Sequence, residues 1–458
     1  MTKIKLINPL VRHSVIKTTN AQQWAYSLGN LGCALPYQAI GAVLLFFYVD
    51  VHTMAPMTAA AIMTGYAIYN ALNNPLMGYL SDQTKTIWGR RIPYVLFGTI
   101  PYALFFSLLF LVPFSGSDHP TALLVWFILG LFLFETMATI VQTTYYAAYP
   151  EMFSDYKDRT SIATRMNLFQ VIGLVIGAAL PISLARIIGW PGMGIFLGVI
   201  TALALLIATR GMFERKSSMY NKSIPFGQAL KATFMNRSFL TIVSAQMMRN
   251  FSTAVVTSGL AFYIKYSLGL DPTTTTIVLG TIFIVAATML YPWKRTLAHW
   301  FEPRTNLFIA YALMGVSTIP LFFAQSLTAV ILIAVLMGIA LAGLLLMGYV
   351  TPADVIDEDE IKTGQRREGM YLGMSGMIIT LAYAFSSIVF GWISNIYGYD
   401  PLLPAQPASV AHGFRVFVSI PPAIGSLLAI LSLVFYPLHG KRLQEIKNTL
   451  KEKSASIQ

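Results

Sequence analysis

The sequence predicts an all-α integral membrane protein with about twelve membrane-spanning helices. Of its 458 residues, 56% are hydrophobic and only 11% are charged, whereas a soluble domain carries about 25% charged residues. The hydrophobic residues recur in long runs, most of which reach the roughly 20 residues that a helix needs to cross a bilayer. A transmembrane barrel would alternate apolar and polar residues instead, so these runs indicate helices.

Twelve apolar runs account for the expected spans. They cover residues 24–49, 56–80, 93–114, 121–148, 161–188, 191–209, 239–264, 274–293, 306–325, 327–350, 370–397 and 412–437. The longest internal polar stretch separates the sixth run from the seventh. We therefore predict four parts, namely a six-helix half over 1–209, a cytoplasmic loop over 210–237, a second six-helix half over 238–437 and a basic cytoplasmic tail over 438–458. Two six-helix halves are the plan of the major facilitator fold.

The distribution of basic residues predicts the orientation of the chain. If the N-terminus is cytoplasmic, the inside segments hold 26 of the 31 Lys and Arg residues, as the positive-inside rule requires. The protein is therefore expected in the cell membrane, plasma or inner, with both termini in the cytoplasm. Because the basic residues lie in short loops and tails, the net charge of +12 does not indicate a nucleic-acid partner.

Cysteine and histidine usage argues against a metal or redox site. Cys33 is the only cysteine, which excludes an intrachain disulfide and a thiolate metal cluster. The six histidines show no spacing typical of metal ligands. No cofactor is expected, apart from a coupling ion, H⁺ or Na⁺.

The loop between the second and third runs carries a recognisable motif. Gly78 and Asp82 are followed by Gly89, Arg90 and Arg91. This pattern resembles the Gly-x-x-x-Asp…Gly-Arg-Arg/Lys motif of the major facilitator superfamily. The resemblance implies a conformational latch, in which Asp82 caps a neighbouring helix or pairs with an Arg in one state of the transporter.

Further segments narrow the resemblance to one family. They are Phe47–Val51, Tyr69–Gly78, Trp88–Tyr94, Tyr146–Pro150, Asp158–Arg165 and Asp354–Gly369. Together they resemble the glycoside–pentoside–hexuronide:cation symporters, the group that contains the melibiose permease. The resemblance covers most of the chain and implies transport by alternating access.

Several positions depart from the family pattern. The acidic residues of the second helix, which bind the cation in melibiose-type members, are replaced by Asn70 and Asn74. Alternatively, these amides satisfy backbone groups freed by Pro75. The resemblance assigns the substrate site to five positions. Two of them, Tyr146 and Arg165, keep the family's aromatic and arginine, and the others hold Gln142, Ala34 and Thr380 in place of charged residues.

Glu135 is the one acidic side chain well inside a predicted span. Thr139 and Gln142 follow it at spacings of four and three, which places all three on one helix face. Intramembrane carboxylates are costly and usually face a bundle interior or a water-filled cavity. We therefore predict that Glu135 is the proton or cation site.

The predicted partners of Glu135 are Asn70, Asn74 and Thr139, with Arg165 as a countercharge. The alternative is a structural glutamate paired with Arg165 or with Arg249. A separate acidic run, Asp357–Glu360, lies beside Lys362 in the predicted loop between the tenth and eleventh spans. It is interpreted as a salt-bridge latch in preference to a metal site.

The sequence leaves three functions open. The first is a secondary active transporter, a cation-coupled symporter of a glycoside or related sugar. The second is a transporter of lysophospholipid or another amphipathic solute on the same fold. The third, a membrane-embedded enzyme or a non-transporting sensor, finds little support, because the chain has no phosphate loop, zinc-helix motif or Gly-x-Ser-x-Gly elbow. We expect no enzymatic activity. The expected partners are a small-molecule substrate, a monovalent cation and the lipid bilayer, and the expected state is a monomer.

Overall fold

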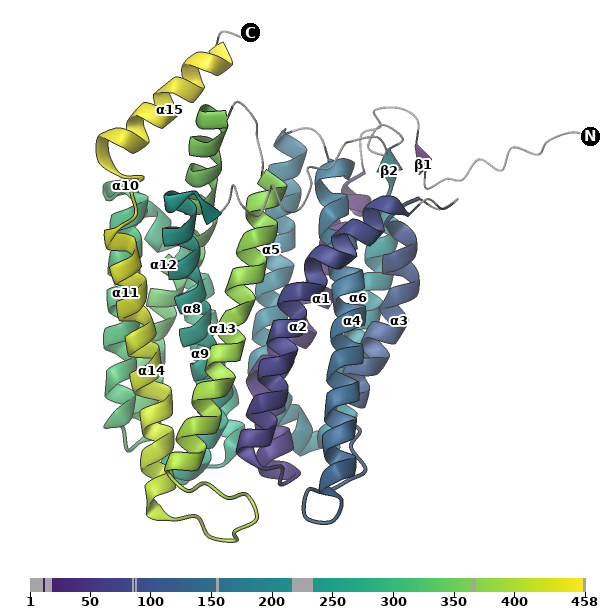
Figure 1. The fold of residues 1–458 in the computed structure, drawn as a ribbon, viewed down its shortest axis with the longest axis vertical. Helices are drawn as coiled ribbons and strands as arrows, with labels where there is room; N and C mark the ends of the chain where they lie inside the picture. The colour runs from purple at the N-terminus through teal and green to yellow at the C-terminus, as the bar shows by residue number, and fades with distance from the viewer. Residues whose placement is uncertain are drawn as a thin grey trace, which may run out of the picture. The chain divides into compact units, whose positions relative to one another are not determined.

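A computed structural model describes residues 11–12, 19–84, 86, 89–153, 156–215, 234–363 and 368–455. These residues are almost entirely helical (Figure 1). Twelve long helical segments succeed one another in the part of the chain so described, and they are α1 (Asn20–Ala39), α2 (Pro56–Gln83), α3 (Ile92–Leu108), α4 (Pro120–Met152), α5 (Tyr156–Ala179), α6 (Pro181–Gly211), α8 (Arg237–Phe262), α9 (Thr275–Arg295), α11 (Pro303–Thr318), α12 (Leu327–Thr363), α13 (Glu368–Ile396) and α14 (Ala408–Val434).

Shorter elements extend or connect these helices. Two π-helical turns, Ile40–Leu44 and Phe47–Val51, continue α1, and a third, Tyr263–Ser267, continues α8. The remaining pieces are the short helices Pro272–Thr274, Ile319–Phe322 and α10 (Leu297–Trp300), the terminal helix α15 (Gly440–Ala455), and a parallel pair of two-residue strands, β1 (Val11–Arg12) and β2 (Glu214–Arg215).

The helices have the length and composition of membrane spans. Eight of those in the described residues are long and apolar enough to cross a bilayer, and Ile92–Leu108 is a shorter apolar helix. The long helices α1, α2 and α8 are not among the eight, because they carry amide and guanidinium side chains within their length. Together these helices confirm the prediction of an all-α membrane protein with about twelve spans.

Local sequence signals explain where the helices begin. Thr19 caps α1 by accepting a hydrogen bond from the backbone of Gln22, whose side chain accepts one in return, which forms a capping box. The Asn236 side chain caps α8 in the same way, by accepting from the Phe239 N–H. Proline stands in the first turn of α3, α4, α6 and α11. Backbone N–H groups in the first turn have no acceptor within the helix, so a residue that lacks this group costs no hydrogen bond there.

The predicted boundary between the fifth and sixth spans was wrong. The prediction ended the fifth span at residue 188, whereas α5 ends at Ala179 and α6 begins at Pro181. Gly189 and Pro191, which suggested a loop, instead form a kink inside α6, where Gly189 has a φ of 74°. That left-handed conformation is accessible to glycine at little cost, so the helix bends there and continues.

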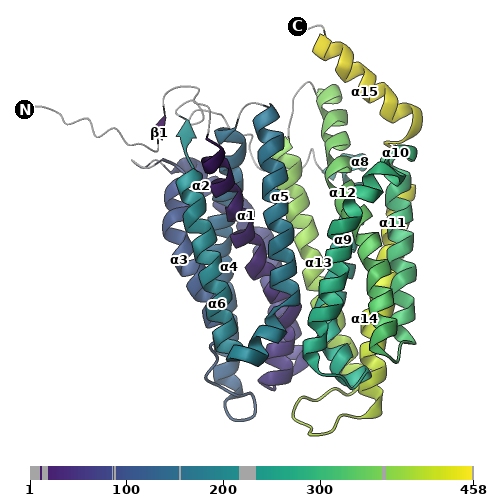
Figure 2. The same ribbon diagram turned by 180° about the vertical axis from the view of Figure 1, so that it is seen from behind.

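The first compact unit contains Met1–Val43 and Leu72–Ser223. Within its described residues, α1 packs against α5 and α6, and α3 packs against α4 and α6 (Figure 2). Glycines allow the closest approach. A Cβ added at Gly177 of α5 would lie 2.4 Å from the Leu35 carbonyl oxygen of α1, so the two backbones are nearly in contact.

The second compact unit contains Leu44–Ala71 and Ile224–Gln458. In it α8 packs against α13 and α14, and α12 packs against α9 and α11. The terminal helix α15 packs against α12. The residues that follow α1 and the first half of α2 therefore group with the later helices, although the predicted halves assign them to residues 1–209.

Candidate functional site

Glu135 lies on α4 and is fully buried, with 0% of its surface exposed. The hydroxyl of Tyr37, on α1, lies 2.8 Å from Oε1 and 2.9 Å from Oε2 of this carboxylate. The Thr139 hydroxyl donates a hydrogen bond of 3.0 Å to Oε1. The carboxyl group is thus held by hydroxyl groups from two helices of the first unit.

The local sequence places these groups together. Thr139 follows Glu135 by one helical turn, so both side chains lie on one face of α4. Phe134, which is fully buried, packs edge-on against the Tyr37 ring at a centroid distance of 5.7 Å. Phe134 also stacks on Tyr102 at 5.3 Å. These ring contacts hold Tyr37 in place against α4.

The polar face of α4 continues beyond Glu135. Gln142 Nε2 donates hydrogen bonds to the Cys33 carbonyl at 3.0 Å and to the Tyr102 hydroxyl at 3.1 Å. The Tyr146 hydroxyl donates to Oδ1 of Asn30 at 2.6 Å, and 41% of the Tyr146 surface is exposed. The predicted face therefore exists as a row of polar side chains, and three of its members bond to α1.

Two predicted substrate contacts, Ala34 on α1 and Arg165 on α5, lie in different surroundings. Ala34 packs against α5, because a Cβ at Gly173 would lie only 3.0 Å from the Ala34 Cβ. The Arg165 guanidinium donates to Gln23 Oε1 at 2.9 Å and to Asn20 Oδ1 at 3.4 Å. It also lies 4.8 Å from the centre of the Trp24 ring.

These contacts correct the prediction that Arg165 is the countercharge of Glu135. Arg165 bonds near the start of α1, at Gln23, whereas Glu135 bonds to Tyr37. Gln23 and Tyr37 are fourteen positions apart in sequence, which corresponds to about 20 Å along a helix and is too far for an ion pair. The alternative of a structural pair between Glu135 and Arg165 is wrong for the same reason.

The remaining predicted residues are less closely tied to Glu135. Asn74 Oδ1 accepts a long hydrogen bond of 3.4 Å from Thr143 on α4, so it lies beside the polar face. Asn70 is nearly buried, with 8% exposed, and belongs to the second unit. Thr380, also in the second unit, donates to the Gly376 carbonyl of its own helix at 2.8 Å. A contact of Asn70 or Thr380 with the Glu135 site stays a prediction.

The predicted latch is only partly described. Gly78 and Asp82 belong to α2, but the contacts that the latch would require of them lie outside what the structure describes. Gly89 has a φ of 109° and closes a tight turn with Thr86. Arg90 and Arg91 are buried, with 9% and 7% exposed, and the Arg91 guanidinium donates to the Ala147 carbonyl of α4. Arg91 thereby connects the start of α3 to the end of α4.

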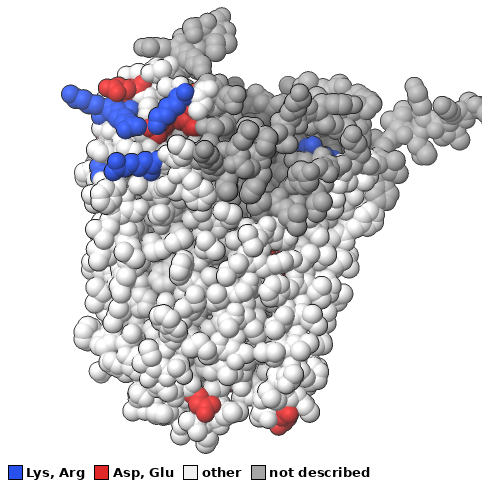
Figure 3. Space-filling model, viewed as in Figure 1, with Lys and Arg blue, Asp and Glu red and all other residues white. Residues whose placement is uncertain are grey.

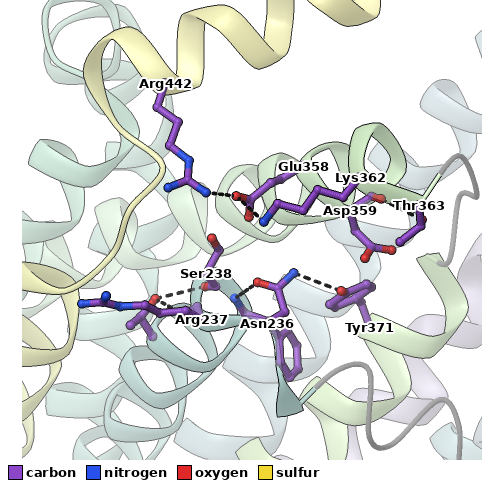
Figure 4. A network of polar contacts seen from close by, with 11 residues as sticks. Asn236, Arg237, Ser238, Glu358, Asp359, Lys362, Thr363, Tyr371 and Arg442 are labelled. Carbon is purple, nitrogen blue, oxygen red and sulfur yellow. Dashed lines mark hydrogen bonds and ion pairs between the residues drawn. The ribbon is translucent and has the colours of Figure 1, made fainter.

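The acidic run Asp357–Glu360 lies in α12 and not in a loop, as the prediction had it. Glu358 accepts hydrogen bonds from Lys362, at 2.8 Å, and from Arg442 of α15 (Figure 4). The described residues contain no group of three His, Cys, Asp or Glu that could hold a metal ion. The predicted salt bridge to Lys362 is present, Arg442 adds a second that was not predicted, and the run is helical because α12 continues to Thr363.

Most of the coloured side chains in Figure 3 lie near the ends of the helices, and most of the described surface between them is uncharged. Such a band is what the hydrocarbon of a bilayer requires. One cluster of blue and red groups lies near the end where α12 and α15 meet (Figures 1 and 3).

Two sets of residues near the described sites have no signal in the sequence that predicts their contacts. Tyr37 has no local signal, because its contact with Glu135 spans 98 residues of sequence. The second set surrounds Asp50, which forms an ion pair of 2.6 Å with Lys265. Asp50 falls in the segment Phe47–Val51 that carries the family resemblance, but no pattern in the sequence pairs it with Lys265.

Comparisons with known proteins agree with this architecture. The family described as MFS/sugar transport protein matches residues 25–440. The isoprimeverose transporter of Lactiplantibacillus pentosus is 24% identical, over 91% of this chain and 88% of the relative. The sodium-dependent lysophosphatidylcholine symporter 1 of Xenopus tropicalis is 22% identical, over 91% and 87%.

A solved structure has the same fold. The bacterial homologue of the human lysosomal transporter Spinster, in an inward-facing and unoccupied conformation, superposes with a TM-score of 0.67 at 12% identity, over 91% of this chain and 95% of that one. The fold, the polar face of α4 and the match over nearly the whole chain lead to one conclusion. This chain is a multi-pass membrane protein that belongs to the MFS/sugar transport protein family of secondary transporters.

Proposed function

We propose that this protein is a proton-coupled symporter of a glycoside or related sugar that works by alternating access. The single observation that carries the proposal is the buried carboxyl group of Glu135, held by the hydroxyls of Tyr37 and Thr139. A carboxylate buried within a span is costly, so its retention is explained by a function that uses its charge.

The nature of its partners favours H⁺ over Na⁺ as the coupling ion. A hydroxyl group both donates and accepts hydrogen bonds. Tyr37 can therefore donate to the ionised carboxylate and can accept from the protonated carboxylic acid after a rotation of its O–H bond. Both protonation states of Glu135 then keep a hydrogen bond without movement of the helices. Asn70, Asn74 and Thr139 would supply further oxygen atoms if the ion were Na⁺.

Coupling follows from differential affinity. If the substrate-loaded transporter binds H⁺ more tightly than the empty one, proton and substrate favour each other's binding by the same factor. We propose that Gln142, Tyr146, Arg165, Ala34 and Thr380 contribute to the substrate site. Tyr146 suits a sugar ring, because its aromatic face is partly exposed while its hydroxyl is anchored to Asn30.

The remaining properties are also proposals. The protein resides in the cell membrane with both termini in the cytoplasm, as the distribution of its basic residues supports. It acts as a monomer, carries a monovalent cation with its substrate, needs no cofactor and catalyses no chemical conversion.

The test is uptake into proteoliposomes under an imposed pH gradient or an imposed Na⁺ gradient. Labelled isoprimeverose and lactose are suitable first probes. We expect a pH gradient to drive uptake, and Glu135→Gln to abolish the stimulation while exchange of substrate across the membrane continues. Asp118→Asn is the matched control, because Asp118 is exposed just before α4. Gradient-driven uptake that is unchanged in Glu135→Gln would remove this residue from the coupling mechanism.

A second candidate function is lysophospholipid transport. It is supported by the similarity to the lysophosphatidylcholine symporter of Xenopus tropicalis, which covers 91% of this chain. Labelled lysophosphatidylcholine therefore forms a second arm of the same experiment. Uptake of the lysolipid without uptake of either sugar would favour this candidate.

A further inference from the structure

Arg249 places a guanidinium group halfway along a membrane-spanning helix. It follows the first residue of α8, Arg237, by twelve positions in a helix of 26 residues, which corresponds to about 18 Å from the helix start. Arginine is always charged in proteins, and a charge at this depth is expensive unless it faces a polar interior and serves a function.

The observed partner of Arg249 is neutral. Nη1 donates a hydrogen bond of 3.2 Å to the Leu344 carbonyl oxygen of α12. Among the described residues no carboxylate forms an ion pair with this guanidinium. Two other cations of the second unit do have a carboxylate partner, because Lys265 pairs with Asp50, and Lys362 with Glu358. Within the described part of the chain, the positive charge of Arg249 is therefore not balanced by an ion pair.

Packing between α8 and α12 holds the guanidinium in place. A Cβ added at Gly348 would lie 2.7 Å from Nη1 of Arg249, so the glycine leaves the space that the guanidinium fills. Gln246, one turn before Arg249, donates to the Gly348 carbonyl at 3.2 Å. The position of the arginine is thus fixed by both helices.

Two tyrosines lie within the electrostatic range of Arg249. Tyr311 is buried, and its hydroxyl donates to the Ala245 carbonyl at 2.7 Å. Tyr383, on α13, is 39% exposed. Arg249 is itself half-buried. The half-buried guanidinium carries several N–H donors, one of which bonds to the Leu344 carbonyl, and such donors are what an anionic oxygen group requires.

We infer that Arg249 binds an anionic group, a carboxylate or a phosphate, on the solute that this protein transports. The inference depends on the proposed transport function in one respect, namely that the ligand is a solute that the protein transports. The planar guanidinium can form two parallel hydrogen bonds to either group. A glycoside bearing a carboxylate and a lysophospholipid bearing a phosphate present the same chemistry to it, and the experiment separates them.

The test measures equilibrium binding to the purified full-length protein in nanodiscs at pH 7.5, without any ion gradient. Two matched pairs of probes are used. The first is p-nitrophenyl β-D-glucuronide against the neutral p-nitrophenyl β-D-glucoside. The second is lysophosphatidylcholine against the uncharged monoacylglycerol of the same chain length. We expect the wild-type protein to prefer the charged member of one pair.

Arg249→Gln should weaken binding of that charged probe by about tenfold or more, as expected for a lost charge-assisted hydrogen bond. Binding of its neutral match should change little. Arg249→Lys keeps the positive charge but cannot form two parallel hydrogen bonds. Its affinity for the charged probe should therefore fall between those of the wild-type protein and Arg249→Gln. Arg304→Gln is the control, because Arg304 also donates to backbone carbonyls, those of Leu433 and Val434, and should leave both affinities unchanged.

Three results would overturn the inference. The wild-type protein would show no preference for either charged probe, or Arg249→Gln would weaken the charged and neutral probes equally, or it would weaken neither. If Arg249→Gln does not fold, the affinities of Arg249→Lys and Tyr383→Phe for the charged and neutral probes are compared in its place. Because no gradient is applied, failure of proton coupling at Glu135 leaves this outcome unaffected, so the two proposals fail separately.

Discussion

Asp50 and Lys265, which are 215 residues apart in sequence, form an ion pair in which Nζ lies 2.6 Å from Oδ2. The Asp50 side chain is almost completely buried, with 4% exposed, whereas 38% of the lysine side chain is exposed. Asp50 Oδ1 also accepts hydrogen bonds from Tyr266 and, at 2.9 Å, from Tyr399. One carboxylate therefore ties the turn after α1 to the turn after α8 and to the loop after α13.

The first prediction is that Asp50→Asn destabilises the protein more than its exposed counterpart Asp118→Asn. Removing the charge leaves Lys265 without its partner and weakens two tyrosine hydrogen bonds. Because Lys265 is partly exposed, we expect a loss of about 1–2 kcal/mol, well below the cost of breaking a fully buried pair. Thermal unfolding in detergent, followed by intrinsic fluorescence, measures the difference.

A double-mutant cycle with Lys265→Met separates the ion pair from the rest of the cluster. If the two substitutions interact, the double variant should be more stable than the sum of the single losses predicts. Purely additive effects would mean that the ion pair contributes nothing measurable and that the tyrosines alone stabilise Asp50.

The second prediction concerns Tyr37. Tyr37→Phe keeps the ring that packs on Phe134 but removes the hydroxyl that contacts both oxygens of Glu135. We expect uptake driven by a pH gradient to fall by about tenfold, the effect of losing one charge-assisted hydrogen bond, with a smaller effect on substrate exchange. Proteoliposome uptake measures both rates.

Tyr291→Phe is the control for this comparison, because Tyr291 is 67% exposed on α9. It should behave as the wild-type protein does. If Tyr37→Phe matched the control in both assays, the Tyr37 hydroxyl would have no part in coupling.

The third prediction tests the close approach of α1 and α5. Gly177→Val would bring a Cβ to within 2.4 Å of the Leu35 carbonyl oxygen and 2.9 Å of the Gln38 Cβ. Backbone atoms cannot move aside easily, so we expect a loss of about 1–3 kcal/mol from overpacking. Gly280→Ala in α9 is the control, since a Cβ there meets nothing within 4 Å. Equal melting temperatures for the two variants would contradict the observed packing.

The fourth prediction concerns the attachment of α15 to α12. Glu358 lies 31 residues beyond the first residue of α12, about 46 Å along the helix, and so lies outside the hydrocarbon, which is about 30 Å thick. Burial alone would raise its pKa, but hydrogen bonds from Lys362, Ser238 and Arg442 outweigh that effect and hold the pKa below the usual 4.5. The ionised Glu358 carboxylate therefore stabilises the attachment of α15 above pH 4.5. This stabilisation is lost as the pH falls through the lowered pKa that Glu358 has in the folded protein.

Hydrogen exchange of α15 should therefore be slow at neutral pH and should accelerate, after correction for the intrinsic rate, as the medium becomes more acidic than pH 4.5. Glu358→Gln should produce fast exchange of α15 already at pH 7, because the amide cannot pair with Arg442. Glu445→Gln, on α15 itself, is the control. Exchange of α15 that depends neither on pH nor on Glu358 would show that its apolar contacts alone attach it.

Composition and periodicity were sufficient to predict most of the fold. Hydrophobic runs gave the helices, and the spacing of Glu135, Thr139 and Gln142 gave the polar face of α4, because both depend on local sequence. The end of α12 could not be predicted in this way. A run of charges suggested a loop, whereas Asp357–Glu360 continues a helix whose acidic side chains find basic partners at Lys362 and Arg442.

Contacts between helices were beyond the reach of sequence reasoning. Arg165 was assigned to Glu135 because opposite charges attract, yet its guanidinium bonds to the amides of Asn20 and Gln23. The tyrosine that does contact Glu135 lies 98 residues earlier. Such pairings depend on the rotation and vertical offset of one helix against another, which no pattern along a single segment specifies.

The length of α12 has a mechanical consequence. Its 37 residues make a rod of about 55 Å, nearly twice the thickness of the hydrocarbon, so several turns project into the aqueous phase. Over such a length a slight change of tilt within the lipid moves the projecting end of the helix sideways by a larger distance. Because Arg442 of α15 forms an ion pair with Glu358 near that end, α15 moves with it. A movement of α12 inside the bilayer is thus transmitted to a helix in the aqueous phase.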